Sequence, residues 1–97
     1  MADMTEARRA IETSNVLVFA CPVYWCGVPG LMKTFIDRLF FYYHPQNRQL
    51  LMDKRCLVLA PLNQFNVSRE TEPFVELFKR IFSCLDMQLI GMFFSAV

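Results

Sequence analysis

A short, uninterrupted apolar run at residues 16–20, Val-Leu-Val-Phe-Ala, limits the possible fold of this chain more than any other feature. It offers no polar residue to a solvent-facing side, which is typical of a strand covered on both faces of a parallel sheet. Residues 57–60 repeat the pattern, and residues 89–94 repeat it less cleanly around Gly91. The sequence therefore predicts three buried strands.

Three amphipathic segments alternate with these runs. Residues 3–13 open with a pair typical of a capping box, Asp3 and Glu6. Residues 28–40, and a segment that starts near residues 71–73 and ends before residue 88, carry apolar side chains at helical spacing. The alternation predicts an α/β fold in one domain over residues 1–97, with a three-stranded parallel sheet and flanking helices.

Composition and charge argue against several classes of function. Ten basic and nine acidic residues give a net charge of +1 without a run of like charge, so we expect no nucleic-acid binding. Two prolines and two glycines interrupt the uncharged stretch 13–32, which argues against a membrane span. Residues 1–9 are charged and lead into no signal-peptide core, so we expect a cytoplasmic location.

The four cysteines do not form a recognisable reactive or metal-binding motif. Their spacing lacks a CxxC pair and the Cys/His pattern of a zinc site, so we expect buried thiols and no metal site. A phosphatase-type loop starting at Cys26 would need an arginine where Met32 stands. The cysteines are Cys21, Cys26, Cys56 and Cys84.

The segment 21–30, Cys-Pro-Val-Tyr-Trp-Cys-Gly-Val-Pro-Gly, joins the first predicted strand to the second predicted helix. Pro29 lies where the first turn of a helix tolerates proline. Open α/β sheets bind ligands at the carboxyl ends of their strands, where backbone groups at helix starts are free to face a crevice. We therefore expect a ligand-facing loop here.

The residues of this loop and of the helix after it resemble a known family. They are similar to the signature of flavodoxin-like NAD(P)H-dependent FMN reductases, which iron-sulfur flavoproteins share. The preceding segment 10–15 also resembles the family, with Asn15 in place of the usual aspartate. The residues that carry the signature are Pro22-Val23-Tyr24-Trp25, Gly27-Val28-Pro29-Gly30, Met32-Lys33, Phe35 and Ile36-Asp37-Arg38.

The resemblance implies a partial flavodoxin-like fold. Flavodoxin-like sheets have the strand order 2-1-3-4-5, and this sequence has counterparts only for strands 3-4-5. The first two strands, the phosphate-binding loop and the last helix have none. The strand Val16–Ala20 would then keep an unpaired edge, so we expect a homo-oligomer or a partner chain that covers it.

The resemblance also implies FMN as cofactor and NAD(P)H as electron donor. Tyr24 and Trp25 offer flat apolar surface to the flavin ring, although packing beneath the loop would explain them equally well. The amides of residues 23–27 offer donors to its polar edge, and those of residues 63–64 could bind the ring, cap the next helix or face water. The expected cofactor-binding residues are Pro22, Val23, Tyr24, Trp25, Cys26, Gly27, Asn63 and Gln64.

Two functions follow from the resemblance. One is a flavin oxidoreductase that transfers two electrons through FMN to a quinone, a flavin or another small acceptor. The other is a shortened, non-catalytic module that acts by association. We assign no catalytic residue, because Lys33 and Asp37 read as an exposed helical pair and His44 as a lone loop histidine. The aromatic run 40–43 favours a contact surface.

Overall fold

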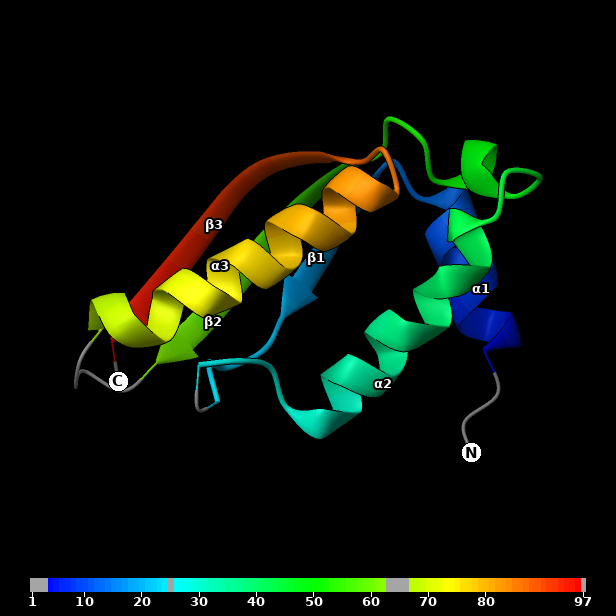
Figure 1. Ribbon diagram of the computed structural model, residues 1–97. Helices are drawn as coiled ribbons and strands as arrows, with labels where there is room; N and C mark the ends of the chain where they lie inside the picture. The colour runs from blue at the N-terminus through cyan, green and yellow to red at the C-terminus, as the bar shows by residue number, and fades with distance from the viewer. Residues whose placement is uncertain (1–3, 25, 63–66, 97) are drawn as a thin grey trace.

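The computed structural model describes residues 4–24, 26–62 and 67–96. Helices and strands alternate along the chain, as the sequence predicts (Figure 1). Two short 3-10 segments, η1 (Leu39–Tyr43) and η2 (Arg48–Leu50), lie between the second helix and the second strand. The main elements are α1 (Thr5–Thr13), β1 (Val16–Ala20), α2 (Gly30–Arg38), β2 (Arg55–Leu62), α3 (Val67–Cys84) and β3 (Gln88–Ala96).

The three strands form one parallel sheet in the order β1-β2-β3. Val16 pairs with Arg55 at the start of β1, and Ala20 pairs with Leu59 at its end. Between β2 and β3 the register shifts after Cys56, so that Ile90 lies opposite no residue of β2. The predicted three-stranded parallel sheet is confirmed.

The hydrophobic core lies on one side of this sheet, under α2 and α3. In Figure 1, α3 lies in front of the strands and α2 lies to the right of β1. Phe19 of β1 contacts an α2 ring and two α3 rings, with centroid distances of 6.2 Å to Phe35, 5.9 Å to Phe78 and 5.2 Å to Phe82. The apolar stripes that predict the two helices are the faces that pack on the sheet.

The other side of the sheet is bare within the described residues. Val18 retains 54% of its accessible surface and Phe93 retains 58%. The expectation that β1 is covered on both faces is therefore wrong for this part of the chain. An uninterrupted apolar run indicates a strand that avoids water on both sides, but it does not say which segment covers each side.

Helix α1 packs beside η1 at the amino end of the fold. Ile11 is its buried residue, and the buried Tyr42 hydroxyl donates a hydrogen bond of 2.8 Å to the Glu12 carboxylate. Lys54 donates to the carbonyl oxygens of Glu12 (3.0 Å) and Ser14 (2.5 Å), where a cation complements the helix dipole.

Two helix starts differ from the sequence prediction. α1 begins at Thr5 with Met4 as its N-cap. Asp3 of the predicted capping box lies outside the described residues. α2 begins at Gly30 with Pro29 as N-cap, and its stripe continues into η1. Both starts lie within two residues of the predicted ones.

The start of α3 differs more. It begins at Val67, and Pro73 lies inside the helix, where the sequence suggested a first turn. A proline in a helix interior removes one N–H donor, which leaves the carbonyl oxygen four residues earlier without its helical partner. In α3 that oxygen belongs to Arg69.

Replacing Phe78 by alanine should lower the free energy of unfolding by about 3–5 kcal/mol. Phe78 is fully buried and packs against the rings of Phe19, Phe74 and Phe82. Urea unfolding followed by circular dichroism measures the change. Leu31→Ala is the matched control, because Leu31 is 86% exposed and should cost under about 0.5 kcal/mol. Equal stabilities of the two variants would contradict this core.

Candidate functional site

The loop predicted to face a ligand follows β1 at the carboxyl edge of the sheet. It first continues the ladder with β2: the amide of Cys21 donates to the carbonyl oxygen of Leu59, and that of Val23 to the carbonyl oxygen of Pro61, each at 3.1 Å. Backbone bonds to the central strand thus hold the loop in place.

The loop then reverses in a tight turn. The amide of Tyr24 donates to the carbonyl of Gly27 at 2.9 Å, and the amide of Gly27 donates back to the carbonyl of Tyr24 at 2.8 Å. Cys26 lies in the left-handed region with φ 67°. Glycine or asparagine is usual at such a turn position, so the cysteine side chain stands where the backbone alone would favour another residue.

The Cys26 thiol connects this turn to α3. Its Sγ lies 3.8 Å from the carbonyl oxygen of Arg69, the oxygen that Pro73 leaves without a helical donor. The thiol is a weak donor, and it lies at a carbonyl that the proline nitrogen four residues later cannot bond. The sequence analysis did not find this contact. In the sequence, the one sign of this contact is Pro73, a proline within the apolar helical pattern of α3.

The predicted cofactor-binding residues lie around this turn with different exposures. Val23 is buried, while Pro22, Cys26 and Gly27 are half-buried. Tyr24 is 59% exposed, so packing beneath the loop does not account for its ring. Trp25, Asn63 and Gln64 lie outside the described residues.

The backbone donors of the loop are in part already used. The amides of Val23, Tyr24 and Gly27 all donate within the protein. The first turn of α2 is different: Lys33 donates its amide to the Pro29 carbonyl at 3.0 Å, and the amides of residues 30–32 precede that bond. Because the N-cap Pro29 has no side-chain hydrogen bond, this helix start offers donors beside the turn.

The backbone conformation at Gly27 and Gly30 does not require glycine. Both have ordinary φ values. A Cβ on Gly27 would meet only the Tyr24 carbonyl oxygen at 3.7 Å, and a Cβ on Gly30 would meet nothing within 4 Å. Glycine therefore leaves open surface here, which permits close approach of another molecule to the backbone.

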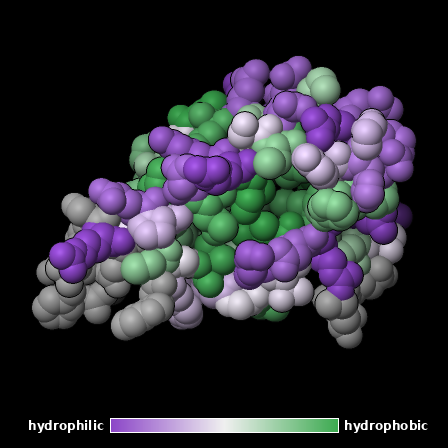
Figure 2. All heavy atoms as spheres, in the orientation of Figure 1, coloured by the Kyte–Doolittle hydropathy of each residue, from purple (hydrophilic) through white to green (hydrophobic). Residues whose placement is uncertain are grey.

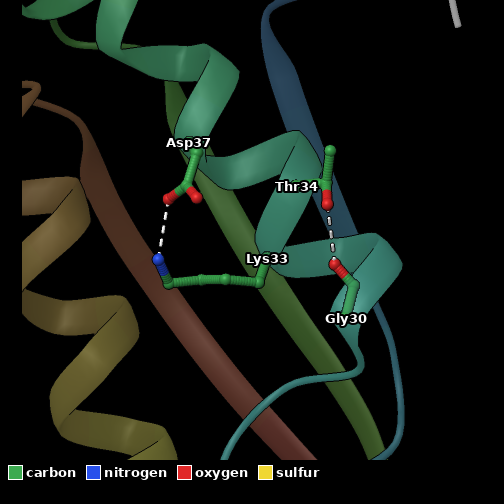
Figure 3. Close-up of polar contacts among 4 residues, drawn as sticks. All are labelled: Gly30, Lys33, Thr34 and Asp37. Carbon is green, nitrogen blue, oxygen red and sulfur yellow. Dashed lines mark hydrogen bonds and ion pairs between the residues drawn. The ribbon is translucent and has the colours of Figure 1, made fainter. Parts of the chain in front are cut away.

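Lys33 and Asp37 form the exposed ion pair on α2 that their spacing predicts. Lys33 Nζ lies 2.7 Å from Asp37 Oδ1, with side chains 51% and 62% exposed. Figure 3 shows this pair on one side of α2 and the bond from the Thr34 hydroxyl to the Gly30 carbonyl (3.0 Å) on another. An exposed pair at this spacing contributes about 0.3–0.5 kcal/mol to the stability of the helix.

A separate apolar groove of about 610 Å³ lies between α2 and α3. Figure 2 shows it as a green hollow between purple rims. Its lining includes Phe40 and Tyr43 of the aromatic run, whose rings stack at 5.7 Å, with His44 edge-on to Phe40 at 4.9 Å. Of the described loop residues 22–24 and 26–27, none lines the groove, so these residues and the groove form different surfaces.

The cysteines are free thiols in different environments. Burial raises the pKa of the Cys21 thiol above its ordinary value and raises the pKa of Cys56 to about 11. Cys84 is exposed and Cys26 is half-buried. Within the described part of the chain, no three His, Cys, Asp or Glu side chains are grouped to hold a metal ion.

These environments predict which thiols react. At about pH 8, iodoacetamide should modify Cys84 first, because the thiolate is the nucleophile and burial disfavours it at Cys21 and Cys56. Cys56 should stay protonated in the folded protein until the pH approaches 11, and react only after urea is added. Peptide mass spectrometry identifies the sites, with Cys84→Ala as control. Rapid native labelling of Cys56 would contradict the packing.

Comparison with known proteins supports the interpretation of this loop. Residues 1–96 match the family model described as "Flavodoxin-like fold". The chain belongs to this family. The resemblance inferred from the loop and the helix after it is therefore confirmed.

Three known proteins show what share of a flavodoxin-like protein this chain matches. A putative NAD(P)H-dependent FMN-containing oxidoreductase of Bacillus subtilis is 32% identical over 81 residues, covering 79% of this chain and 44% of that protein. An iron-sulfur flavoprotein of Archaeoglobus fulgidus is 48% identical over 42 residues, 43% of this chain and 19% of the other. The solved structure of Trp repressor binding protein from Bacillus subtilis matches with a TM-score of 0.85 and 26% identity, covering 98% of this chain and 58% of that one.

The flavodoxin-like chain thus spans about half the length of the two Bacillus subtilis proteins, 44% of one and 58% of the other. The three strands described here form a partial sheet of that fold, as expected. None of the described helices is long and apolar enough to cross a bilayer.

Proposed function

We propose that this chain forms one side of the FMN site of an NAD(P)H-dependent flavin oxidoreductase. The observation that carries the proposal is the turn 24–27 at the carboxyl edge of the sheet, with the exposed Tyr24 ring beside the uncapped start of α2. The similarity to an FMN-containing oxidoreductase supports it. Bound FMN would supply the redox chemistry, taking hydride from NAD(P)H and passing two electrons to a quinone, a flavin or another small acceptor.

The residues of this chain would bind and orient the flavin. Tyr24 offers an exposed aromatic face to the isoalloxazine ring, and Gly27 leaves space for the ring to approach the backbone. The free amides at the start of α2 and the helix dipole would stabilise negative charge on the reduced ring. Pro22, Val23 and Cys26 would hold the turn in shape, since they are half-buried or buried at its base.

Trp25, Asn63 and Gln64 complete the proposed site. Trp25 follows Tyr24 in the sequence, and residues 63–64 follow the last residue of β2. In a parallel sheet the segments after neighbouring strands lie close together, so residues 63–64 would face the flavin opposite the turn.

The second candidate is a non-catalytic module that acts by association. In the part of the chain that the structure describes, β1 is an edge strand and one face of the sheet has no helix over it. Both features favour association, because an unpaired strand edge and an exposed apolar surface are unfavourable in water. A second copy of the chain, as a homo-oligomer, or a partner chain would cover them. Retention of flavin separates the two candidates.

If the first function is correct, the purified protein mixed with excess FMN should keep bound flavin after gel filtration, with quenched flavin fluorescence. Tyr24→Ala and Trp25→Ala should each weaken binding about fivefold or more, because base–aromatic and flavin-like stacking is worth about 1–3 kcal/mol per ring. Tyr43→Ala is the control, since Tyr43 is also an exposed tyrosine but lies on η1. No retention at micromolar protein would end the oxidoreductase proposal.

The variant Gly27→Ala tests whether Gly27 is needed for folding or for flavin binding. Its Cβ would make only ordinary contact with the Tyr24 carbonyl oxygen, so the free energy of unfolding should stay the same or rise by up to about 1 kcal/mol. FMN binding should weaken, since the methyl group occupies space that the ring would use. Unchanged flavin affinity in this variant, measured by fluorescence titration, would place the flavin elsewhere.

A further inference from the structure

Cys26 has a backbone conformation that its residue type does not favour. Among the described residues, three that are not glycine have positive φ values: Cys26 at 67°, Asp53 at 66° and Asp86 at 57°. Aspartate adopts this left-handed region more readily, because its short polar side chain can bond the local backbone. Cysteine has only a thiol, which is a weak donor. The contacts of that thiol therefore decide what a cysteine contributes at this position.

The thiol contacts the helix that follows β2. Sγ of Cys26 lies 3.8 Å from the carbonyl oxygen of Arg69, which is 43 residues later in the chain. Four positions after Arg69, Pro73 lies inside α3. In a regular helix the amide of residue 73 would bond this oxygen, but proline has no amide hydrogen to donate. The thiol thus reaches the oxygen without displacing that helical bond.

An amide at position 73 would compete with the thiol for the Arg69 oxygen. A backbone amide is a stronger donor than a thiol, and the helix would hold it in line with the carbonyl. With alanine at position 73, α3 would gain this bond and lose a residue that is poorly compatible with a helix interior. The same substitution would weaken the contact between Cys26 and α3.

The turn 24–27 has anchors on two sides. Val23 donates its amide to the Pro61 carbonyl of β2 at 3.1 Å, and the amides of Tyr24 and Gly27 close the turn at 2.9 and 2.8 Å. These bonds fix the turn to the central strand, and the Cys26 contact adds an anchor on α3. The turn carries the exposed Tyr24 ring, so the orientation of that ring depends on both anchors.

On the basis of the flavin site proposed above, we propose that Pro73 is a positioning residue for it. Because Pro73 withholds an amide from the Arg69 carbonyl, this oxygen stays available to the Cys26 thiol, and the contact holds the turn against α3. The role requires no contact between Pro73 and the flavin. It explains a proline in the interior of α3 as a loss of helix stability that orders the candidate site.

Pro73→Ala should have opposite effects on stability and on flavin binding. The Tm should rise by about 4 °C or more, because alanine replaces proline inside a helix. The affinity for FMN should fall about threefold or more, because binding would then have to order a loosened turn. Circular dichroism during heating and fluorescence titration with FMN measure the two effects. A substitution that acted through stability alone would not lower the affinity.

A double variant tests whether Pro73 acts through Cys26. Cys26→Ala removes the thiol and should lower the affinity for FMN about as much as Pro73→Ala does. The double variant should bind FMN no more weakly than either single variant, because both substitutions remove one contact. Ser83→Ala is the matched control, since it places alanine in the exposed last turn of α3, at the other end of the helix from Arg69. It should change the affinity less than about twofold.

Hydrogen exchange without flavin tests the coupling of the turn to α3 separately. In Pro73→Ala, the amides of Tyr24 and Gly27 should exchange about threefold faster or more than in the unsubstituted chain, because the turn opens more often. Amides in the middle of α3, residues 76–82, should exchange more slowly. Nuclear magnetic resonance of the 97-residue chain measures both sets. A general change in stability would shift both sets in the same direction.

Three results would overturn the role of Pro73. The first is exchange at Tyr24 and Gly27 that is no faster in Pro73→Ala than in the unsubstituted chain. The second is an affinity for FMN that Pro73→Ala leaves unchanged or raises. The third is a double variant whose loss of affinity is the product of the two single losses, which would show that Pro73 does not act through Cys26. Failure of the unsubstituted chain to retain FMN overturns the proposed function, while the exchange rates decide separately whether the turn and α3 are coupled.

Discussion

The packing of Phe19 between the sheet and two helices is the contact on which the structure depends. Its ring meets Phe35 of α2 and both Phe78 and Phe82 of α3, so it joins three elements that are distant in sequence. Such ring pairs contribute about 0.5–1.5 kcal/mol each beyond their burial. Phe19 is also the penultimate residue of β1, two positions before Cys21. The contact that fixes the core therefore fixes where the candidate loop leaves the sheet.

Because the core lies on one side of the sheet, apolar side chains on the other side are exposed to water. The same strands that bury Phe19, Cys56 and Val58 under the helices expose Val18 and Leu59 to water. Alternation along a strand makes this unavoidable: a sheet with apolar residues on both faces needs cover on both. The helix-free side of the sheet, the outer edge of β1 and the candidate loop all involve β1, so the packing of this strand positions all three.

The sequence predicted element order and the position of the loop well, because apolar runs and helical stripes record local periodicity. β1 has the predicted bounds, and the loop lies at the strand end as expected. Periodicity could not predict that helices cover only one face of the sheet. It shows that Val18 is apolar, but it does not show which segment packs on Val18. It also misplaced the start of α3, because Pro73 is typical of a first turn but is tolerated here with a thiol at the Arg69 carbonyl.

The Cys26 contact also bears on how the candidate site holds its shape. The turn is fixed to β2 through Val23 and Pro61, and to α3 through Cys26 and Arg69. α3 is the helix that follows β2, so both anchors belong to elements that flank residues 63–66. The two segments proposed to face the flavin are therefore tied to the same strand and helix. A ring bound between them would meet a turn whose backbone bonds already exist, and little ordering free energy would be lost on binding.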